Sequence, residues 1–160
     1  MKVFDWRTIS VLISGYGYGP SPVMGWDEGN DVFQWERVKP GVSHKMGVDG
    51  RMTASKSADN SVKAVLKLSQ LSPTNADLSF MFNLQQMPGE MGVFLHFQDA
   101  MRQDVASTTV GYIENHAPIH RGGEAVGTEW TLIFESGLGE LGDPTFAGTP
   151  SDVAENLGVA

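Results

Sequence analysis

Hydrophobic and polar residues alternate along most of this chain. From Val62 to Gln70, apolar residues at every second position alternate with polar ones that include Lys63 and Lys67. Successive side chains of a strand point to opposite faces, so this pattern predicts a strand with one buried face. The segment 128–135 repeats the alternation around Trp130 and predicts a second such strand.

Further segments alternate more weakly, and each is bounded by Gly, Pro, Asn or Asp. They are residues 8–14, 32–37, 42–46, 51–56, 93–98 and 105–113. Short strands separated by turns are typical of antiparallel all-β domains. The chain is therefore predicted to be mainly β, an antiparallel β-sandwich or barrel.

One segment, at about residues 72–86, predicts a flanking α-helix instead of a strand. Ser72 precedes Pro73, which suits an N-cap followed by the first helical residue, while Thr74 and Asp77 have capping-box spacing. The helix is therefore expected to begin after an N-cap at either Ser72 or Thr74. Apolar residues surround much of the predicted helix, so we expect it to be largely buried.

Two long segments show no clear alternation. The segment 16–31 is rich in glycine and proline, and we expect no regular element there. Residues 137–160 hold four acidic residues and no Lys or Arg. We interpret the chain as a β domain over residues 1–136 followed by an acidic C-terminal arm over 137–160, flexible or docked on a neighbour.

Composition narrows the classes of function. The 160 residues suit a single domain, no apolar run is long enough to span a membrane, and nothing at the N-terminus predicts secretion. Zero cysteines exclude disulfides and thiolate chemistry. The net charge of −8 argues against binding nucleic acid through phosphates. It suits either a channel wall that repels a polyanion or simple solubility.

Three candidate binding sites lack the residue pattern that their ligand would need. Gly15–Pro20 lacks the ending of a phosphate-binding loop, and Asp27–Asp31 has Val38 where a calcium loop needs glutamate. His116 and His120 are separated by Pro118, which opposes the helix that would align them on zinc. No residue pattern predicts catalysis, a metal or a cofactor.

Three aromatic residues, Trp26, Phe33 and Trp35, lie around the end of the glycine-rich segment and the next predicted strand. They could stack on sugars, which would suit a monomeric carbohydrate-binding module. Aromatic residues in strands more often form cores or subunit contacts. We favour subunit contacts.

Several motifs, in order, resemble the tail tube proteins of contractile-tailed bacteriophages. They are Gly-Val-Asp-Gly-Arg at 47–51, Lys-Ser-Ala-Asp-Asn-Ser at 56–61, the strand from Val62 and Ser-Pro-Thr-Asn-Ala-Asp-Leu at 72–78. The likeness extends over about residues 6–136. It implies a β-sandwich with one flanking helix, six of which form a ring whose inner sheets join into a lumen barrel.

The resemblance also assigns roles to residues. A hairpin over 42–61 would reach the adjacent ring, and the residues expected in this stacking contact are Val42, His44, Met46, Val48, Asp49, Gly50, Arg51 and Met52. Candidates for the lumen wall are Lys63, Lys67, Glu129 and Glu135, although either polar face could instead meet solvent or the sheath.

The sequence thus predicts a virion structural protein whose hexameric rings stack into the inner tube of a contractile tail. Its partners would be further copies of itself and the sheath, tape measure and baseplate proteins. DNA would pass through the lumen without specific binding, and assembly would take place in the host cytoplasm. A tube protein of a type VI secretion system or a tailocin is the alternative.

Overall fold

The computed structural model describes residues 6–29, 31–89, 92–100 and 103–142, which fold as a β-rich domain with one α-helix. A 3-10 turn, η1 (Trp6–Thr8), precedes the first strand. The strands are β1 (Ile9–Gly15), β2 (Tyr18–Pro22), β3 (Phe33–Arg37), β4 (Val42–Met46), β5 (Met52–Lys56), β6 (Val62–Leu68), β7 (Val93–Asp99), β8 (Asp104–Thr108), β9 (Gly111–Asn115), β10 (Thr128–Phe134) and β11 (Gly137–Glu140). The helix is α1 (Thr74–Gln85).

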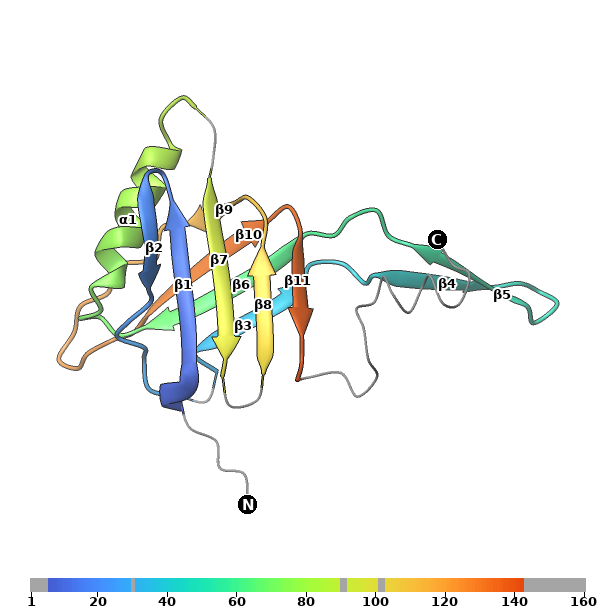
Figure 1. The fold of residues 1–160 in the computed structure, drawn as a ribbon, viewed down its shortest axis with the longest axis horizontal. Coiled ribbons are helices and arrows are strands. Elements are labelled where there is room, and N and C mark those ends of the chain that lie inside the picture. The colour runs from blue at the N-terminus through green and yellow to red at the C-terminus, as the bar shows by residue number, and fades with distance from the viewer. Residues whose placement is uncertain (1–5, 30, 90–91, 101–102, 143–160) are drawn as a thin grey trace, which may run out of the picture.

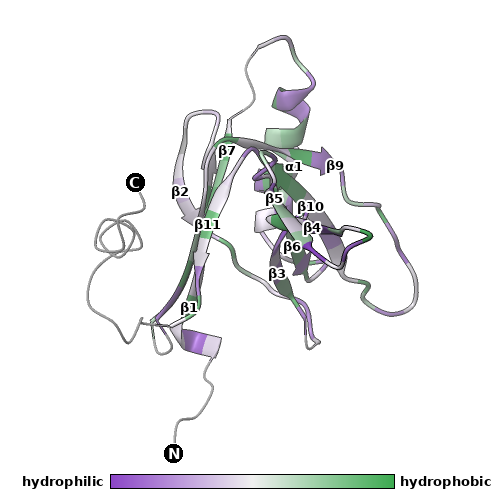
Figure 2. Cartoon of the chain, turned by 90° about the vertical axis from the view of Figure 1, so that its right-hand side faces the viewer, coloured by the Kyte–Doolittle hydropathy of each residue, from purple (hydrophilic) through white to green (hydrophobic). Residues whose placement is uncertain are grey.

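The strands form two layers, and every pairing is antiparallel. One layer has the order β2-β1-β7-β8-β11, and the other has the order β9-β10-β6-β3 (Figures 1 and 2). A single pair, Val93 with Gly111, joins β7 to β9 and makes the corner between the layers. Strands β4 and β5 pair only with each other and project from the end of the second layer (Figure 1). The expected antiparallel β-sandwich with one helix is confirmed.

The core lies between the two layers. Strand β6 supplies four inward side chains, and β10 places three large ones opposite them in register. These residues are Val62, Ala64, Leu66, Leu68, Trp130, Leu132 and Phe134, all at most 1% exposed. Strands β1 and β7 cover them from the other layer. Alternation in the sequence therefore marks the core-facing side chains correctly, although Val65 on the other side of β6 is also buried.

Helix α1 begins at Thr74 with Pro73 as its N-cap residue, so its start falls between the starts predicted by an N-cap at Ser72 and by one at Thr74. The Ser72 hydroxyl accepts a hydrogen bond from the Thr74 amide and donates one to the Met24 carbonyl, which ties the helix start to the loop after β2. The expectation of a largely buried helix is wrong. Leu78 and Met81 are buried, but Phe80 is 47% exposed, because α1 packs on the sandwich by one face.

Gln85 joins the end of α1 to the outer edge of β9. Its side-chain nitrogen donates to the Ile113 carbonyl at 2.7 Å, and its side-chain oxygen accepts from the Ile113 amide at 2.9 Å. The amide group thus takes the place that a neighbouring strand would occupy. This pair of bonds closes part of an edge that would otherwise recruit another chain.

Three other predictions are corrected. The segment 105–113 is two strands, β8 and β9, because the chain bends between Thr108 and Gly111 and passes from β7 in one layer to β10 in the other. The glycine-rich segment contains β2, whose register with β1 shifts near Gly15. Residues 137–140 form β11 on β8, so the sheet extends into the segment read as an acidic arm. Residues 143–160 lie outside the described part, and the domain boundary at 136 stays a prediction.

Replacing Gln85 with alanine should lower the free energy of unfolding by about 1–3 kcal/mol, because both backbone groups of Ile113 lose their partner. The check is urea denaturation at neutral pH. The neighbouring variant Gln86→Ala is the matched control, because Gln86 is exposed, and it should change stability by less than about 0.5 kcal/mol. Equal stability of the two variants would contradict the bridging role.

Candidate assembly surfaces

Strands β4 and β5, with the turn between them, form an arm over residues 42–56. Every residue of both strands is exposed. The turn is held by Gly47 N to Arg51 O at 2.7 Å, by Gly50 N to Gly47 O at 3.0 Å and by Arg51 N to the Asp49 carboxylate at 3.1 Å. Gly50 has φ of +81°, a conformation that suits glycine. The turn predicted at 48–50 is therefore present, within a loop of residues 47–51.

The arm has one apolar face. Residues paired across the two strands point to the same side, and the pairs Val42–Lys56, His44–Ala54 and Met46–Met52 therefore share a face. The pairs Ser43–Ser55 and Lys45–Thr53 share the other, which is polar. A two-stranded hairpin that buries nothing is marginally stable at best in water. The apolar face therefore indicates a contact surface.

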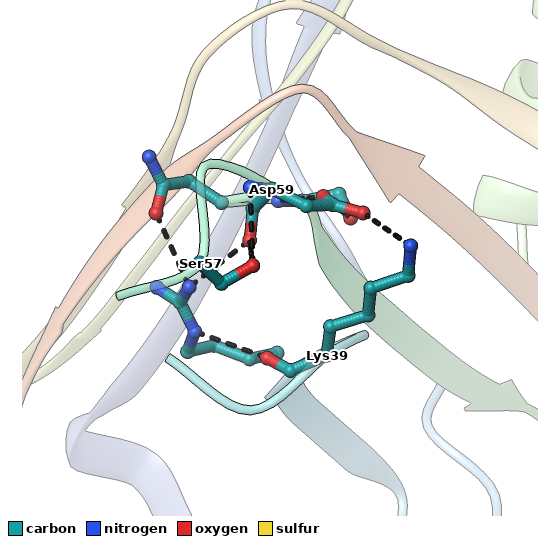
Figure 3. Close-up of polar contacts among 6 residues, drawn as sticks. Lys39, Ser57 and Asp59 are labelled. Atoms are coloured by element: carbon teal, nitrogen blue, oxygen red, sulfur yellow. Dashed lines mark hydrogen bonds and ion pairs between the residues drawn. The ribbon is translucent and has the colours of Figure 1, made fainter. Parts of the chain in front are cut away.

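A polar cluster links the segments before β4 and after β5 at the base of the arm (Figure 3). Arg37 donates through its guanidinium to the carbonyls of Lys39 and Asp59 and to the Asn60 side chain. The Lys39 ammonium lies 3.3 Å from the Asp59 carboxylate. The Ser57 amide donates to the Gly41 carbonyl at 2.9 Å and adds a backbone link. These bonds orient the arm relative to the sandwich.

Asp59 is the acidic member of this cluster. Its carboxylate accepts the Ser61 hydroxyl at 2.6 Å and the Ser61 amide at 3.0 Å. These two hydrogen bonds, with the nearby Lys39, lower the pKa of Asp59 from 3.8 to about 2. The carboxylate is thus charged under all ordinary conditions and holds the loop before β6 in place.

The four predicted lumen residues all lie on the outer face of the β9-β10-β6-β3 layer. Register pairs Glu129 with Lys67, which places opposite charges side by side on this face, whereas Lys63 pairs with the apolar Ile133. Glu129 and Glu135 are exposed, and both lysines are half-buried. The face is mixed, because Val65 and Ile133 lie on it among the charged side chains. Which way it points in an assembly stays a prediction.

The aromatic residues Trp26, Phe33 and Trp35 pack against the core and are half-buried. Phe33 stacks on Phe97 of the opposite layer, with ring centroids 4.9 Å apart. The Trp35 ring lies under β11, where a Cβ at Gly139 would come within 2.7 Å of it. This packing disfavours an open platform for sugars. Whether their exposed parts contact another subunit stays untested.

The strand edges differ in how accessible they are. Strand β2 carries Pro20 and Pro22, which have no N–H to offer a neighbouring strand. Strand β9 is blocked by Val93 at one point and by the Gln85 side chain at another. Strands β3 and β11 have no strand on their outer sides among the described residues. Both border a pocket of about 410 Å³ that opens between the layers and is lined by Phe33, Trp35 and Phe97.

The described residues contain no group of three or more His, Cys, Asp or Glu side chains that could hold a metal. None of their helices is long and apolar enough to cross a membrane. His116 packs between Phe82 and Trp130, and its Nδ1 lies 2.8 Å from the Ala117 carbonyl. This histidine therefore has a packing role.

Sequence reasoning missed the cluster at the base of the arm. Ser57, Asp59 and Ser61 sit between two strands, and short polar side chains in such positions bond to nearby backbone groups. The local bonds of these three residues could therefore have been predicted from their positions in the sequence. The long-range partners Arg37 and Lys39 could not, because only the fold brings residues 37–39 beside 57–61.

A comparison with protein families matches residues 1–134 to the family described as the bacteriophage PhiTE tail tube protein. The match covers most of the chain. Among curated proteins, none matches. A solved structure, the cryo-EM structure of the anti-feeding prophage cap, a tube terminating cap, superposes with a TM-score of 0.52 at 9% identity, over 88% of this chain and 93% of that one. At this identity the likeness concerns the fold alone.

The Ser61→Ala variant should raise the pKa of Asp59 from about 2 toward 3.8, because the Ser61 hydroxyl is the first cause of its lowering. The lowered pKa means that this charge stabilises the fold above about pH 3.8 and that the stabilisation is lost as pH falls through about 2. Carboxyl-carbon NMR titration of both proteins measures the shift. An unchanged Asp59 midpoint in the variant would show that Ser61 does not hold the carboxylate.

Proposed function

Because the chain belongs to the bacteriophage PhiTE tail tube protein family and is therefore a structural component of a virion tail, we propose that six copies form a ring and that rings stack into the inner tube of a contractile tail. The observation that carries this proposal is the exposed arm with one apolar face. Such a surface has no use in an isolated monomer, and it suits a contact between stacked rings.

The proposed lumen wall is the outer face of the β9-β10-β6-β3 layer. The arm continues directly from β3 and β6, so a tube that stacks through the arm has this layer in a fixed relation to its axis (Figure 1). Lys63, Lys67, Glu129 and Glu135 would then face the channel. Their mixed charges, on a chain of net charge −8, support passage of DNA without tight binding.

The edges support ring closure within a layer. Strand β3 has a free edge, and edges that would promote aggregation in a monomer are covered by neighbours in a closed ring. The exposed parts of Trp26, Phe33 and Trp35 lie at or beside this edge and would contact the next subunit. In this proposal the protein has no catalytic activity and needs no cofactor.

The remaining partners follow from the same role. The outside of the tube would meet the sheath, its ends would meet the baseplate, and the tape measure protein would occupy the lumen before DNA is ejected. Subunits would assemble in the host cytoplasm. A type VI secretion or tailocin tube shares this architecture, and the genes beside this one would separate the three.

Purified protein should form hollow tubes or six-membered rings. Negative-stain electron microscopy gives the shape, and mass photometry of the same sample gives the number of subunits. A monomer alone, both at high concentration and with preformed baseplate ends added as nuclei, would contradict the tube assignment.

Replacing Val48-Asp49-Gly50 by a shorter turn should leave the sandwich folded and block tube growth, because these residues lie outside the core. The turn loses the hydrogen bonds of Gly50 N and the Asp49 carboxylate, so the free energy of unfolding should fall by no more than about 2 kcal/mol. Circular dichroism checks the fold and electron microscopy checks assembly. Tubes of normal length from this variant would exclude a stacking role for the turn.

The lumen assignment can be tested by labelling, because the chain has no cysteine. A Glu129→Cys variant in assembled tubes should react with a small maleimide and be protected from one carried on a large polyethylene glycol chain. Gln98→Cys, on the outer face of the opposite layer, is the control and should react with both. Equal labelling of the two positions by the large reagent would place Glu129 outside the channel.

A further inference from the structure

Basic charge is concentrated on and beside the arm. Residues 37–56 hold five basic residues and one acidic residue, a net charge of +4. The other residues of the chain therefore carry −12 against the total of −8. The arm itself, residues 42–56, holds Lys45, Arg51 and Lys56 against Asp49, a net charge of +2, and it combines an apolar face with this positive charge on a negative body. A surface that fits it should be apolar at its centre and acidic around it.

Such a surface lies at the opposite end of the β9-β10-β6-β3 layer. Strand β6 starts at the arm and runs away from it, and seven residues of strand span roughly 23 Å. Where β6 ends and β10 begins, four exposed apolar side chains lie in the adjoining loops. These residues, here called the distal patch, are Met24, Leu71, Ile119 and Val126.

Hydrogen bonds hold the loops of the distal patch together. The Val126 amide donates to the Gln70 side chain at 3.1 Å, next to Leu71. The Met24 amide donates to the Thr74 hydroxyl at 3.0 Å. Leu71 is 87% exposed and Ile119 is 75% exposed, although both lie next to ordered segments. Apolar side chains gathered on an ordered surface indicate a contact site.

Acidic residues lie in the same segments as the distal patch. The segments 23–29, 69–77 and 116–128 contain Asp27, Glu28, Asp77 and Glu124, and Arg121 is their one Lys or Arg residue. Asp27 lies against Gly127, because a Cβ at Gly127 would come within 2.0 Å of its carboxylate. The charge of the patch is therefore opposite to that of the arm.

We propose that the apolar face of the arm docks on the distal patch of a second copy of this chain, with the basic residues of the arm against the acidic residues around the patch. This inference deepens the proposed function, on which it rests. The arm points away from its own distal patch, so one copy cannot satisfy both surfaces (Figure 1). A contact between two different surfaces is heterologous and extends as an open series of copies.

Paired cysteines test the contact directly, because the chain has none of its own. Met52→Cys, on the apolar face of the arm, is mixed with Leu71→Cys, and mild oxidation should give a disulfide-linked heterodimer. Mass spectrometry of the linked peptides identifies it. Thr53→Cys, on the polar face of the arm, is the matched control and should link to Leu71→Cys about tenfold less.

A second control tests the receptor. Tyr112→Cys lies beside the groove at the arm base, which also has acidic residues, and Met87→Cys lies past the end of α1. Linkage of Met52→Cys to either of these at the yield found with Leu71→Cys would overturn the proposal. The same conclusion would follow from equal linkage by the Thr53→Cys control.

Charge reversal gives an independent readout. The double variant Glu28→Lys with Glu124→Lys, made in the Leu71→Cys protein, should lower the yield of heterodimer about tenfold at low salt, and Lys45→Glu with Lys56→Glu in the partner should restore it. Failure to restore the yield in folded protein would contradict the proposed pairing of charges.

The outcomes separate this inference from the proposed function. Wild-type tubes without a preferred link between Met52→Cys and Leu71→Cys would leave the tube assignment intact and overturn the docking site. A preferred link in protein that forms no tubes would support the docking contact and contradict the tube assignment.

Discussion

The pairing of β6 with strands on both of its sides is the interaction on which the rest of the structure depends. Its inward side chains at Val62, Ala64, Leu66 and Leu68 are fully buried, and its outward lysines lie on the outer face. Its first residue follows the Asp59 loop that holds the arm. One buried strand therefore sets the direction of the arm and the orientation of the outer face together, because neither can turn without disrupting the core.

The edges of the sheets show a division between protected and available surface. Prolines keep the edge of β2 from pairing with another strand. A single side chain of α1, Gln85, does the same for part of the edge of β9. Strand β3 keeps a free edge, and the pocket beside it is lined by aromatic rings. A protein that must stay soluble and then associate needs such a difference, because open edges associate without discrimination.

Alternation predicted the sandwich well, because strands with one face in the core have an unambiguous period of two. It failed where burial did not impose that period. Strand β11 contains Gly137 and Gly139, which carry no side chain for a pattern to register, yet both are needed because the Trp35 ring lies against them. Strand β2 was hidden by its prolines. The surfaces of the arm were predictable, whereas the bonds from Arg37 to Asp59 and Asn60 depend on the fold.

The separation of charge along the chain bears on how assembly is controlled. Repulsion between bodies of like charge opposes unordered association, while a basic arm is attracted to an acidic surface on another copy. The apolar face contributes affinity only once the arm is aligned, because the hydrophobic effect acts over the area that is removed from water. In the proposed contact, charge would therefore determine which surface the arm binds, and burial of the apolar face would provide most of the affinity. In the proposed assembly, the arm, whose two strands are exposed throughout, would bury its apolar face only against another copy.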